Sequence, residues 1–471
     1  MHTLDAAFVH VPRWTGGRRE IMVLPLGVPA MANLLADEGR KVEILHLGVE
    51  RELDASFSAH AWLQARSPKL VLLSLHWHPQ TRAVIECAER VRAWLPDAKV
   101  VLGGLTATVF AREAMEALAC LDGVVRGDGE EPVRTLAAAV VEGRADWSHV
   151  PNLVWRCGRE VRDNGHSWAL DASTAGRLRH ADLKLLSHAR AYVDRALYAD
   201  FSEGASGSQG YAGTAYVNAG RGCHADCVSC GGASEGQRVT SLRSGILLYP
   251  LDKLAIDVRD AVDQGAKSLR MSFDPPPARE HIRRWFERIR ASGHRLKLLY
   301  DFWYLPGSRL LDEMQRTFAP GSVAILSPEC GSEQVRYRIR GMPFSNERLM
   351  RAIREAEQRG LAVHCFFSAG LPTETRADVD ETARLIERIR KETGAAISVC
   401  PMQIDPASPM FLHPERYGVR LVRRTLGDFY DFKGIAGGPG YETDHFDEAG
   451  VMEACNRLLA VAGLPPIVAG N

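Results

Sequence analysis

Three cysteines lie close together near the middle of the chain, at a spacing that suits metal chemistry. Cys223, Cys227 and Cys230 form a C-x3-C-x2-C run directly after an apolar stretch, residues 214–217, that is typical of a strand. Thiolates are the usual protein ligands of iron–sulfur clusters, and three of them can bind three irons of a four-iron cubane. The fourth iron is then open to a ligand that is not protein. The spacing therefore favours a [4Fe–4S] cluster whose open iron binds and reduces a small molecule.

Other interpretations of these cysteines stay open at this point. A structural zinc ion also binds cysteines, but its tetrahedral site needs four ligands. No C-x2-C or H-x3-H pair follows nearby, although His224 or a distant cysteine can complete such a set. A disulfide role is disfavoured, because the ten cysteines are scattered without the spacing of a disulfide framework. This usage of cysteine fits a reducing cytoplasm best.

Length and composition set the broad class of the protein. With 471 residues, 46% of them hydrophobic and 25% charged, the chain suits a soluble globular protein of two domains plus an appendage. Lys+Arg and Asp+Glu both number 58, a balance that gives no electrostatic footprint for DNA or RNA. No apolar run approaches the ~20 residues that span a bilayer, and the first residues lack the features of a signal peptide. We therefore expect a cytoplasmic protein without nucleic-acid or membrane partners.

Residues 1–145 alternate apolar strands with amphipathic helices, a pattern typical of a doubly wound parallel α/β sheet. Ligands of such sheets bind beyond the carboxyl ends of the strands. Strands are expected at residues 4–11, 42–47, 70–75, 100–102 and 124–125, and helices at residues 30–38, 83–94, 111–118 and 132–141.

The ends of three of these strands carry small and polar residues that suit a bulky ligand. Glycines there allow the backbone to approach the ligand closely, and the N-terminus of the following helix favours a phosphate group. The candidate cofactor-binding residues at these strand ends are Ser74, His76, Gly103, Gly104, Thr106, Gly127, Gly129 and Glu130.

The remainder of the chain divides into three parts. Residues 146–210 are less regular and are expected to form a linker, which ends in the small-residue stretch 204–210. Residues 211–420 alternate strands and helices again, and residues 421–471 are expected to form a small helical appendage. Strands of the third part are expected at residues 215–218, 268–273, 296–300, 323–326, 362–367 and 397–401.

The cysteine run, together with the order and spacing of these later strands, resembles the radical SAM superfamily. The resemblance covers about the C-terminal half of the chain and implies a partial (β/α)6 TIM-type barrel with its site at the carboxyl ends of the strands. In that family the open iron chelates the amino and carboxylate groups of S-adenosylmethionine. An electron from the reduced cluster then cleaves the sulfonium to methionine and a 5′-deoxyadenosyl radical. Ser229 departs from the family, which usually has an aromatic residue before the third cysteine.

The resemblance assigns cofactor contacts to three charged residues of the barrel. Asp274 follows the second barrel strand, where a carboxylate would accept the ammonium of the methionyl group. Glu329 lies in a segment that resembles the family's E-S-G-S run and would reach the ribose or the amino group. Arg340 would bind the carboxylate as a fork donor, although an exposed cation at a helix end is an equally good interpretation.

A turn after the fifth barrel strand gives the second strongest resemblance. Gly370 and Leu371 begin a G-L-P-T-E-T string (residues 370–375) that matches the family's G-x-P-x-E-T turn, whose apolar and backbone groups pack against adenine. The string also predicts the start of a helix, with Thr373 as its cap. Residues 401–410 resemble the P-G-T-P segment that follows the sixth strand in the family.

The first part of the chain resembles the cobalamin (B12)-binding domain that precedes the barrel in one large subfamily. Gly103-Gly104 after the fourth strand and the G-D-G-E-E-P run at residues 127–132 both match that subfamily. The D-x-H-x-x-G motif, which supplies a histidine ligand to cobalt in other cobalamin proteins, is absent. His76 and His78 are possible neighbours of the lower face of the cobalt, although a histidine in such a loop is more often a plain polar contact.

These resemblances imply a class B radical SAM methyltransferase-like enzyme that uses a [4Fe–4S] cluster, S-adenosylmethionine and cobalamin. The implied reaction is methylation of an unactivated carbon of a small molecule, with an external electron donor such as ferredoxin or flavodoxin. Two alternatives stay open. One is a cyclase, rearrangement or oxidation enzyme that uses its cobalamin domain without methyl transfer, and the other is a non-catalytic cobalamin or metal-binding module. Only the substrate's chemistry would separate the first from a methyltransferase, and the sequence does not name the substrate.

Overall fold

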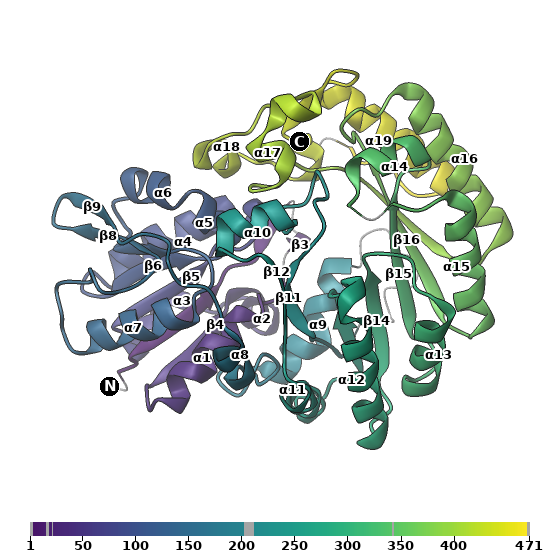
Figure 1. The fold of residues 1–471 in the computed structure, drawn as a ribbon. Coiled ribbons are helices and arrows are strands. Elements are labelled where there is room, and N and C mark those ends of the chain that lie inside the picture. The colour runs from purple at the N-terminus through teal and green to yellow at the C-terminus, as the bar shows by residue number, and fades with distance from the viewer. Residues whose placement is uncertain (1–2, 16–17, 21, 202–211, 342, 469–471) are drawn as a thin grey trace.

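The structure is a computed structural model that describes residues 3–15, 18–20, 22–201, 212–341 and 343–468. Two α/β units lie side by side, and the C-terminal segment lies across both of them (Figure 1). The predicted α/β fold is confirmed: a doubly wound N-terminal sheet is followed by a partial (β/α)6 barrel and a small C-terminal appendage.

The first sheet has seven strands in the order β4-β1-β5-β6-β7-β8-β9. The strands expected from the sequence pair in parallel, and β8 and β9 add an antiparallel edge. The bounds are β1 (Ala6–His10), β4 (Val42–His46), β5 (Leu70–Ser74), β6 (Lys99–Gly103), β7 (Gly123–Val125), β8 (Leu153–Cys157) and β9 (Glu160–Asp163).

Both faces of this sheet are apolar, because helices cover both of them. Phe8 and Leu72 face a core shared with α1 and α7, whereas Val9 and Leu73 face a core shared with α3, α4 and α6. The helices and a small hairpin of this unit are α1 (Gly27–Asp37), α2 (Leu47–Leu53), α3 (Ala59–Arg66), α4 (Thr81–Trp94), α5 (Leu105–Val109), α6 (Ala111–Ala117), α7 (Glu130–Val141), β2 (Arg13–Thr15) and β3 (Arg18–Glu20).

The segment expected to be a linker has structure of its own. Strands β8 and β9 continue the first sheet, and Trp155 of β8 is fully buried with its indole N–H donating to Asn164 Oδ1 at 3.0 Å. Helices α8 (Ala172–Arg177) and α9 (Ala189–Phe201) follow. The small-residue stretch 204–210 lies outside the described residues. The sheet thus extends beyond residue 145, and its added edge is antiparallel.

The second sheet has six strands in chain order, β10-β13-β14-β15-β16-β17, and every neighbouring pair is parallel. Amphipathic helices cover its outer face (Figure 1). The strands are β10 (Thr214–Tyr216), β13 (Ser268–Met271), β14 (Lys297–Phe302), β15 (Val323–Glu329), β16 (Ala362–Ala369) and β17 (Ala396–Pro401), and the helices are α11 (Leu251–Asp263), α12 (Arg279–Ala291), α13 (Ser308–Thr317), α14 (Glu333–Ile339), α15 (Asn346–Gln358) and α16 (Arg376–Glu392).

A hairpin after β10 carries the cysteine run. Strands β11 (Gly220–Cys223) and β12 (Gly245–Leu248) pair in antiparallel fashion, and α10 (Ser234–Ser241) lies between them in the chain. This hairpin stands where the two α/β units meet (Figure 1).

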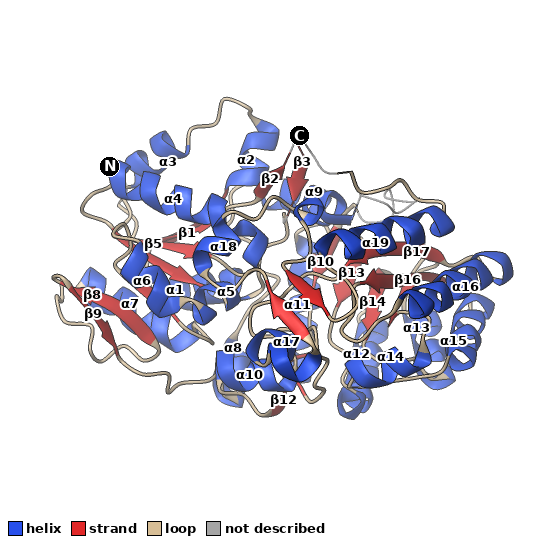
Figure 2. Cartoon of the chain, turned by 90° about the horizontal axis from the view of Figure 1, so that it is seen from above, coloured by secondary structure: helices blue, strands red, loops and turns tan. Residues whose placement is uncertain are grey.

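The C-terminal appendage contains a two-stranded ribbon as well as helices, and so is not purely helical. Its elements are α17 (Pro409–Leu412), β18 (Val419–Leu421), α18 (Leu426–Tyr430), β19 (Tyr441–Thr443) and α19 (Glu448–Ala462). Helix α19 packs against α16, β16 and β17 of the barrel, while α18 packs against α4 of the first unit (Figure 2). Within the described chain, no helix has the length and apolar character that crossing a membrane requires.

Candidate active site

The three cysteines lie on one loop, and two of them accept hydrogen bonds from backbone amides. Ala225 N donates to Cys223 Sγ, and Gly341 N donates to Cys227 Sγ, both at 3.4 Å. Desolvation raises the pKa of Cys230 to about 12, and the charges of Asp405 and Cys227 add to the rise. A bound metal reverses such shifts, because it stabilises thiolates. Amide donors to sulfur are also one of the means by which proteins tune iron–sulfur clusters.

The donor set fits a cluster better than a single metal ion. Among the residues that the structure describes, no three His, Cys, Asp or Glu side chains converge on one ion. Within the described residues, neither His224 nor a distant cysteine completes a preformed four-ligand set with the cysteine loop. A cubane places each thiolate on a different iron, so its ligands stand farther apart.

Glycines hold the cysteine loop tightly against two later segments of the chain. A Cβ on Gly341 would lie 2.7 Å from Ala225 Cβ, and a Cβ on Gly231 would lie 2.7 Å from Asp405 Oδ2. Gly231 N also donates to that Asp405 oxygen at 2.9 Å. Residues 401–410, which the sequence singled out, therefore support the cysteine loop directly.

Glu329 and Arg340 meet at the carboxyl end of β15, as the sequence predicted for two residues of one site. Arg340 Nη1 donates to Glu329 Oε1 at 2.9 Å, and Ser368 Oγ donates to Glu329 Oε2 at 3.1 Å. Arg340 is buried, not an exposed helix-end cation, and its Nε has no hydrogen-bond partner. Glu329 has a φ of +64°, a strained conformation that persists only where its surroundings enforce it.

Asp274 is fully buried and has partners on both oxygens. Arg279 donates to it through two nitrogens at 2.9 and 2.7 Å, and Tyr300 Oη and Trp303 N each donate at 3.2 Å. No sequence pattern indicated Arg279 or Tyr300 as partners of Asp274. Since Trp303 O in turn accepts from Arg340 Nη2 at 2.5 Å, Asp274 helps to orient that arginine. Its contact with the methionyl ammonium stays a prediction that requires one of these bonds to open.

The turn at Gly370 and Leu371 is held from two sides. Both amides donate to Glu374 Oε2, at 2.7 and 3.2 Å, and Tyr441 Oη donates to Gly370 O at 2.5 Å. Gly370 has a φ of +86° and packs against Val451, so a side chain there would collide.

The predicted helix cap at Thr373 is wrong. Helix α16 begins at Arg376 and is capped by Thr375, in a capping box with Asp378. Thr373 instead has a φ of +68° within the turn. The reason is Glu374, whose buried carboxyl group binds the turn amides and so delays the helix start.

At the carboxyl edge of the first sheet, Ser74 and Gly103 are register neighbours on β5 and β6. Gly104 has a φ of +110°, and a Cβ there would lie 2.6 Å from Leu75 O. Thr106 ties the two loops together, since its N and Oγ1 both donate to His76 O, at 3.3 and 3.1 Å. These candidates therefore form one contiguous edge.

Gly103 has room for a side-chain atom at this edge. A Cβ built on it meets nothing nearer than Val125 O at 3.9 Å. Glu130 is only 2% exposed, and its Oε2 has no hydrogen-bond partner. An uncrowded glycine and an orphaned acceptor at this edge fit cobalamin, a bulky ligand with amide donors on its ring.

The loop after β7 also contacts the cysteine hairpin. Gly127 has a φ of +66°, and a Cβ there would lie 2.7 Å from Thr240 O at the end of α10. A Cβ on Gly129 would lie 2.9 Å from Met31 Sδ. Arg221 Nη2 donates to Glu130 Oε1 at 2.5 Å, which no sequence pattern indicated.

The two candidate histidines have different surroundings. His76 is half-buried at the edge, and burial together with the charge of Arg221 lowers its pKa to about 4. His78 is buried against Phe429 and Phe432 of the C-terminal appendage. His78 is therefore a packing residue between units, whereas His76 lies beside the predicted cofactor edge.

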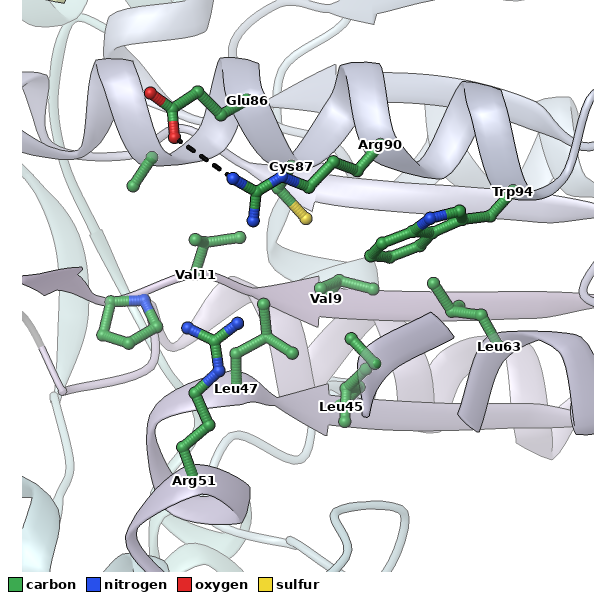
Figure 3. Close-up of a pocket in the computed structure, with 13 residues that line it drawn as sticks. Val9, Val11, Leu45, Leu47, Arg51, Leu63, Glu86, Cys87, Arg90 and Trp94 are labelled. Atoms are coloured by element: carbon green, nitrogen blue, oxygen red, sulfur yellow. Dashed lines mark ion pairs between the residues drawn. The ribbon is translucent and has the colours of Figure 1, made fainter. Parts of the chain in front are cut away.

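A cavity of about 120 Å³ lies elsewhere in the first unit, between α3, α4 and the strands β1 and β4 (Figure 3). Its walls are mainly aliphatic, with Trp94 at one end and the Glu86–Arg90 ion pair near the other. The cavity is lined by none of the predicted cofactor-binding residues.

Two family models match the chain in the order that the sequence indicated. The B12 binding domain matches residues 16–137, and the Radical SAM superfamily matches residues 217–386. The chain therefore contains a B12 binding domain followed by a Radical SAM superfamily domain. It is an enzyme, and its two domains bring a [4Fe–4S] cluster, S-adenosylmethionine and cobalamin as cofactors.

Curated relatives of this radical SAM protein match it over short regions. A hopanoid C-3 methylase of Methylococcus capsulatus is 28% identical over 131 residues, which are 28% of this chain and 24% of the relative. An uncharacterised protein of Methanocaldococcus jannaschii is 34% identical over 100 residues, 21% of this chain and 22% of the relative. The match thus spans about a quarter of the length of these relatives.

Solved structures share the fold over the whole chain. TsrM of Kitasatospora setae, a radical S-adenosylmethionine methyltransferase solved with cobalamin and a [4Fe–4S] cluster, has a TM-score of 0.69 at 16% identity and covers 100% of this chain and 92% of its own. OxsB, a cobalamin-dependent S-adenosylmethionine radical enzyme solved with aqua-cobalamin, also has a TM-score of 0.69, at 14% identity, and covers 96% and 66%. These likenesses show the fold.

Proposed function

We propose that this radical SAM enzyme is a cobalamin-dependent C-methyltransferase, acting on an unactivated carbon of a small molecule or natural-product intermediate. The observation that carries the proposal is the approach of the two predicted cofactor edges. Helix α5, which follows Gly103-Gly104, contacts α10, which follows the cysteine loop. A methyl donor and a radical generator that act on one carbon must lie on two sides of one space.

The relatives supply independent support. One is a hopanoid C-3 methylase, and TsrM is a radical S-adenosylmethionine methyltransferase. When bound, the cluster with S-adenosylmethionine supplies a hydrogen-abstracting radical, and cobalamin supplies the methyl group. The work of the protein is to hold these groups and the substrate in line and to exclude water.

On the barrel side, we propose that Cys223, Cys227 and Cys230 hold the cluster. Glu329 and Arg340 orient the polar groups of S-adenosylmethionine, with the unpartnered Arg340 Nε as a free donor for its carboxylate. The buried turn at Gly370 and Leu371 forms the apolar wall for adenine.

On the cobalamin side, the edge formed by the β5, β6 and β7 loops carries the ring and its side chains. Gly103 provides the space, and Glu130 Oε2 accepts an amide N–H of the ring. The remaining contacts are proposed for Ser74, His76, Gly104, Thr106, Gly127 and Gly129.

The decisive experiment follows the methyl group. Enzyme reconstituted anaerobically with cluster and cobalamin receives S-adenosylmethionine with a deuterated methyl group and candidate substrates from cell extract. We expect S-adenosylhomocysteine, 5′-deoxyadenosine and a product that carries the label. A product that forms with deoxyadenosine but never carries the label overturns methyl transfer.

That outcome would favour the second candidate, a cyclase, rearrangement or oxidation enzyme that uses its cobalamin domain without methyl transfer. The observation in its favour is the TM-score of OxsB, which equals that of TsrM, because OxsB is described as a cobalamin-dependent S-adenosylmethionine radical enzyme and not as a methyltransferase.

The reaction also needs an electron, as in radical SAM enzymes generally. We propose that a ferredoxin or flavodoxin supplies it and that the enzyme works in the cytoplasm. All ten cysteines are free, which fits a reducing compartment.

A further inference from the structure

A cluster of four charged side chains lies where the cobalamin edge meets the cysteine hairpin. This interdomain charge cluster consists of Asp128 and Glu130 from the first unit and Arg221 and Arg243 from the hairpin region. Arg221 Nη1 donates to Asp128 Oδ1 at 3.0 Å, and its Nη2 donates to Glu130 Oε1 at 2.5 Å. Arg243 Nη2 donates to the other oxygen of Asp128.

Burial makes these contacts specific. Asp128, Glu130 and Arg243 are 9%, 2% and 8% exposed, and the two acids balance the two arginines. Buried ion pairs cost free energy to desolvate, so they often add little net stability but do fix one geometry. A site that must hold two cofactors at one separation requires a fixed geometry of this kind.

The position of Arg221 in the chain indicates what the interdomain charge cluster does. Arg221 lies on β11, two residues before Cys223, so its bonds to Asp128 and Glu130 hold the strand that carries a predicted cluster ligand against the first unit. Glu130 is the first residue of α7, directly after the Gly127–Gly129 loop of the cobalamin edge. One arginine thus links the two cofactor edges.

Glu130 uses only one of its oxygens for this link. Oε1 accepts from Arg221, while the buried Oε2 has no hydrogen-bond partner. Its free oxygen suits an amide N–H donor of the kind that the ring of cobalamin carries. The same carboxylate is then shared by a ligand on one side and by Arg221 on the other.

We propose that Arg221 is a positioning residue that fixes the separation between the cluster and cobalamin through Asp128 and Glu130. The geometry of this link does not depend on the reaction, but its effect on coupling rests on the proposed methyl transfer. Lysine cannot replace it fully, because only the guanidinium fork reaches two carboxylates at once.

The test measures distance and coupling in the fully loaded enzyme. Pulsed EPR gives the distance between cobalt(II) of cobalamin and the reduced cluster in wild type, Arg221→Met and Arg221→Lys. We expect one narrow distance in wild type, a broad distribution in Arg221→Met and an intermediate one in Arg221→Lys. The ratio of deoxyadenosine to methylated product should rise in the same order, by up to roughly 100-fold, as expected for a misplacement of about 1 Å.

Arg179→Met is the matched control. Arg179 is also a partly exposed arginine that donates to a buried carboxylate, Asp260, with Nη2–Oδ1 at 2.9 Å, but it does so away from both cofactor edges. Its distance distribution and product ratio should equal those of wild type, even if its thermal stability falls. A structural role alone would move stability in both variants and distance in neither.

Unchanged distance and ratio in Arg221→Lys and Arg221→Met overturn the positioning role. If Arg221→Met does not load both cofactors, Arg221→Lys alone decides, with the same two readouts. Failure of the proposed function looks different: wild type then shows one narrow distance that Arg221 substitutions broaden, yet no variant transfers labelled methyl.

Discussion

Glu374 is a buried carboxyl group whose two oxygens have unequal surroundings. Oε2 accepts from the amides of Gly370 and Leu371, while Oε1 has no hydrogen-bond partner. Burial raises the pKa of Glu374 to about 7, although the two amide donors oppose the rise. The group therefore carries a proton in the folded protein over much of the mildly acidic range.

This shift predicts a pH dependence that Glu374→Gln removes. The pKa of a glutamate rises from the ordinary 4.5 to about 7 on folding here, so the folded state binds the proton more tightly than the unfolded state. Stability from this group is present below pH 4.5 and is lost as pH rises through 7. Glutamine does not titrate and still offers an oxygen to the turn. The free energy of unfolding of Glu374→Gln relative to wild type should therefore rise by about 3 kcal/mol over that window. Denaturant unfolding measures this difference. If the free energy of unfolding varies with pH in the same way in wild type and Glu374→Gln, the raised pKa of Glu374 is contradicted.

The cysteine loop gives a second prediction for single residues. Cys227→Ala should lose most of the about four irons per chain that three cysteines with an open iron imply, and with them all deoxyadenosine formation. Cys157→Ala, a substitution of a half-buried cysteine on β8, should keep both. Iron analysis and product chromatography measure the two effects. Full deoxyadenosine formation in Cys227→Ala would show that Cys227 is not a ligand of the cluster.

Among the elements, the turn from β6 into α5 places two adjacent glycines under opposite constraints. Position 104 requires a glycine for the fold itself, because φ there is +110° and a Cβ would collide with Leu75 O. Gly103 has an ordinary φ, and a Cβ there would make only an ordinary contact with Val125 O at 3.9 Å, so the fold does not require a glycine at this position. We propose that this glycine leaves room for the ligand.

Alanine substitutions should separate these roles. Gly103→Ala should leave the free energy of unfolding within about 1 kcal/mol of wild type yet weaken cobalamin binding, measured by equilibrium titration. Gly104→Ala should cost about 1–3 kcal/mol or more, because a strained backbone adds to a collision. Gly143→Ala is the control, since φ there is +71° and nothing lies within 4 Å. Tight cobalamin binding by Gly103→Ala would place the ligand elsewhere.

The same elements show what sequence patterns can predict. Continuous apolar runs located the parallel strands, because both faces of these strands are buried, and the cysteine and glycine runs located the strand ends. Patterns did not find the partners that only the fold brings together. Arg221 and Glu130 are 91 positions apart, and no local signal links them. Thr373 failed as a cap because the buried Glu374 changes what the turn needs. The edge hairpin β8–β9 was missed because β9 is mostly exposed and polar, so the hairpin has no repeated apolar pattern.

At the scale of the whole molecule, the C-terminal appendage joins the two α/β units. Phe429 of α18 packs on His78 and Phe110 of the first unit, with ring centroids 5.1 and 5.6 Å apart. Tyr441 of β19 donates to Gly370 O in the barrel. The appendage therefore braces both cofactor edges at once.

Truncating this brace should loosen both units. Phe429→Ala should cost about 3–5 kcal/mol, as a buried aromatic does, and should speed hydrogen exchange around His78 and around Gly370. Tyr441→Phe loses one hydrogen bond, worth about 1 kcal/mol, and should change exchange near Gly370 alone. Faster exchange confined to α18 itself in Phe429→Ala would show that the appendage does not join the units.

The C-terminal appendage is synthesised last, and this order has a consequence for cofactor uptake during translation. Domains fold from the N-terminus as the ribosome delivers them, so the first unit and the six barrel strands emerge before Phe429 and Tyr441 do. The edges that these residues brace are then still uncovered. We expect cobalamin, the largest of the three cofactors, to enter most readily during this interval, and a stalled nascent chain ending before α18 to take it up faster than the finished protein.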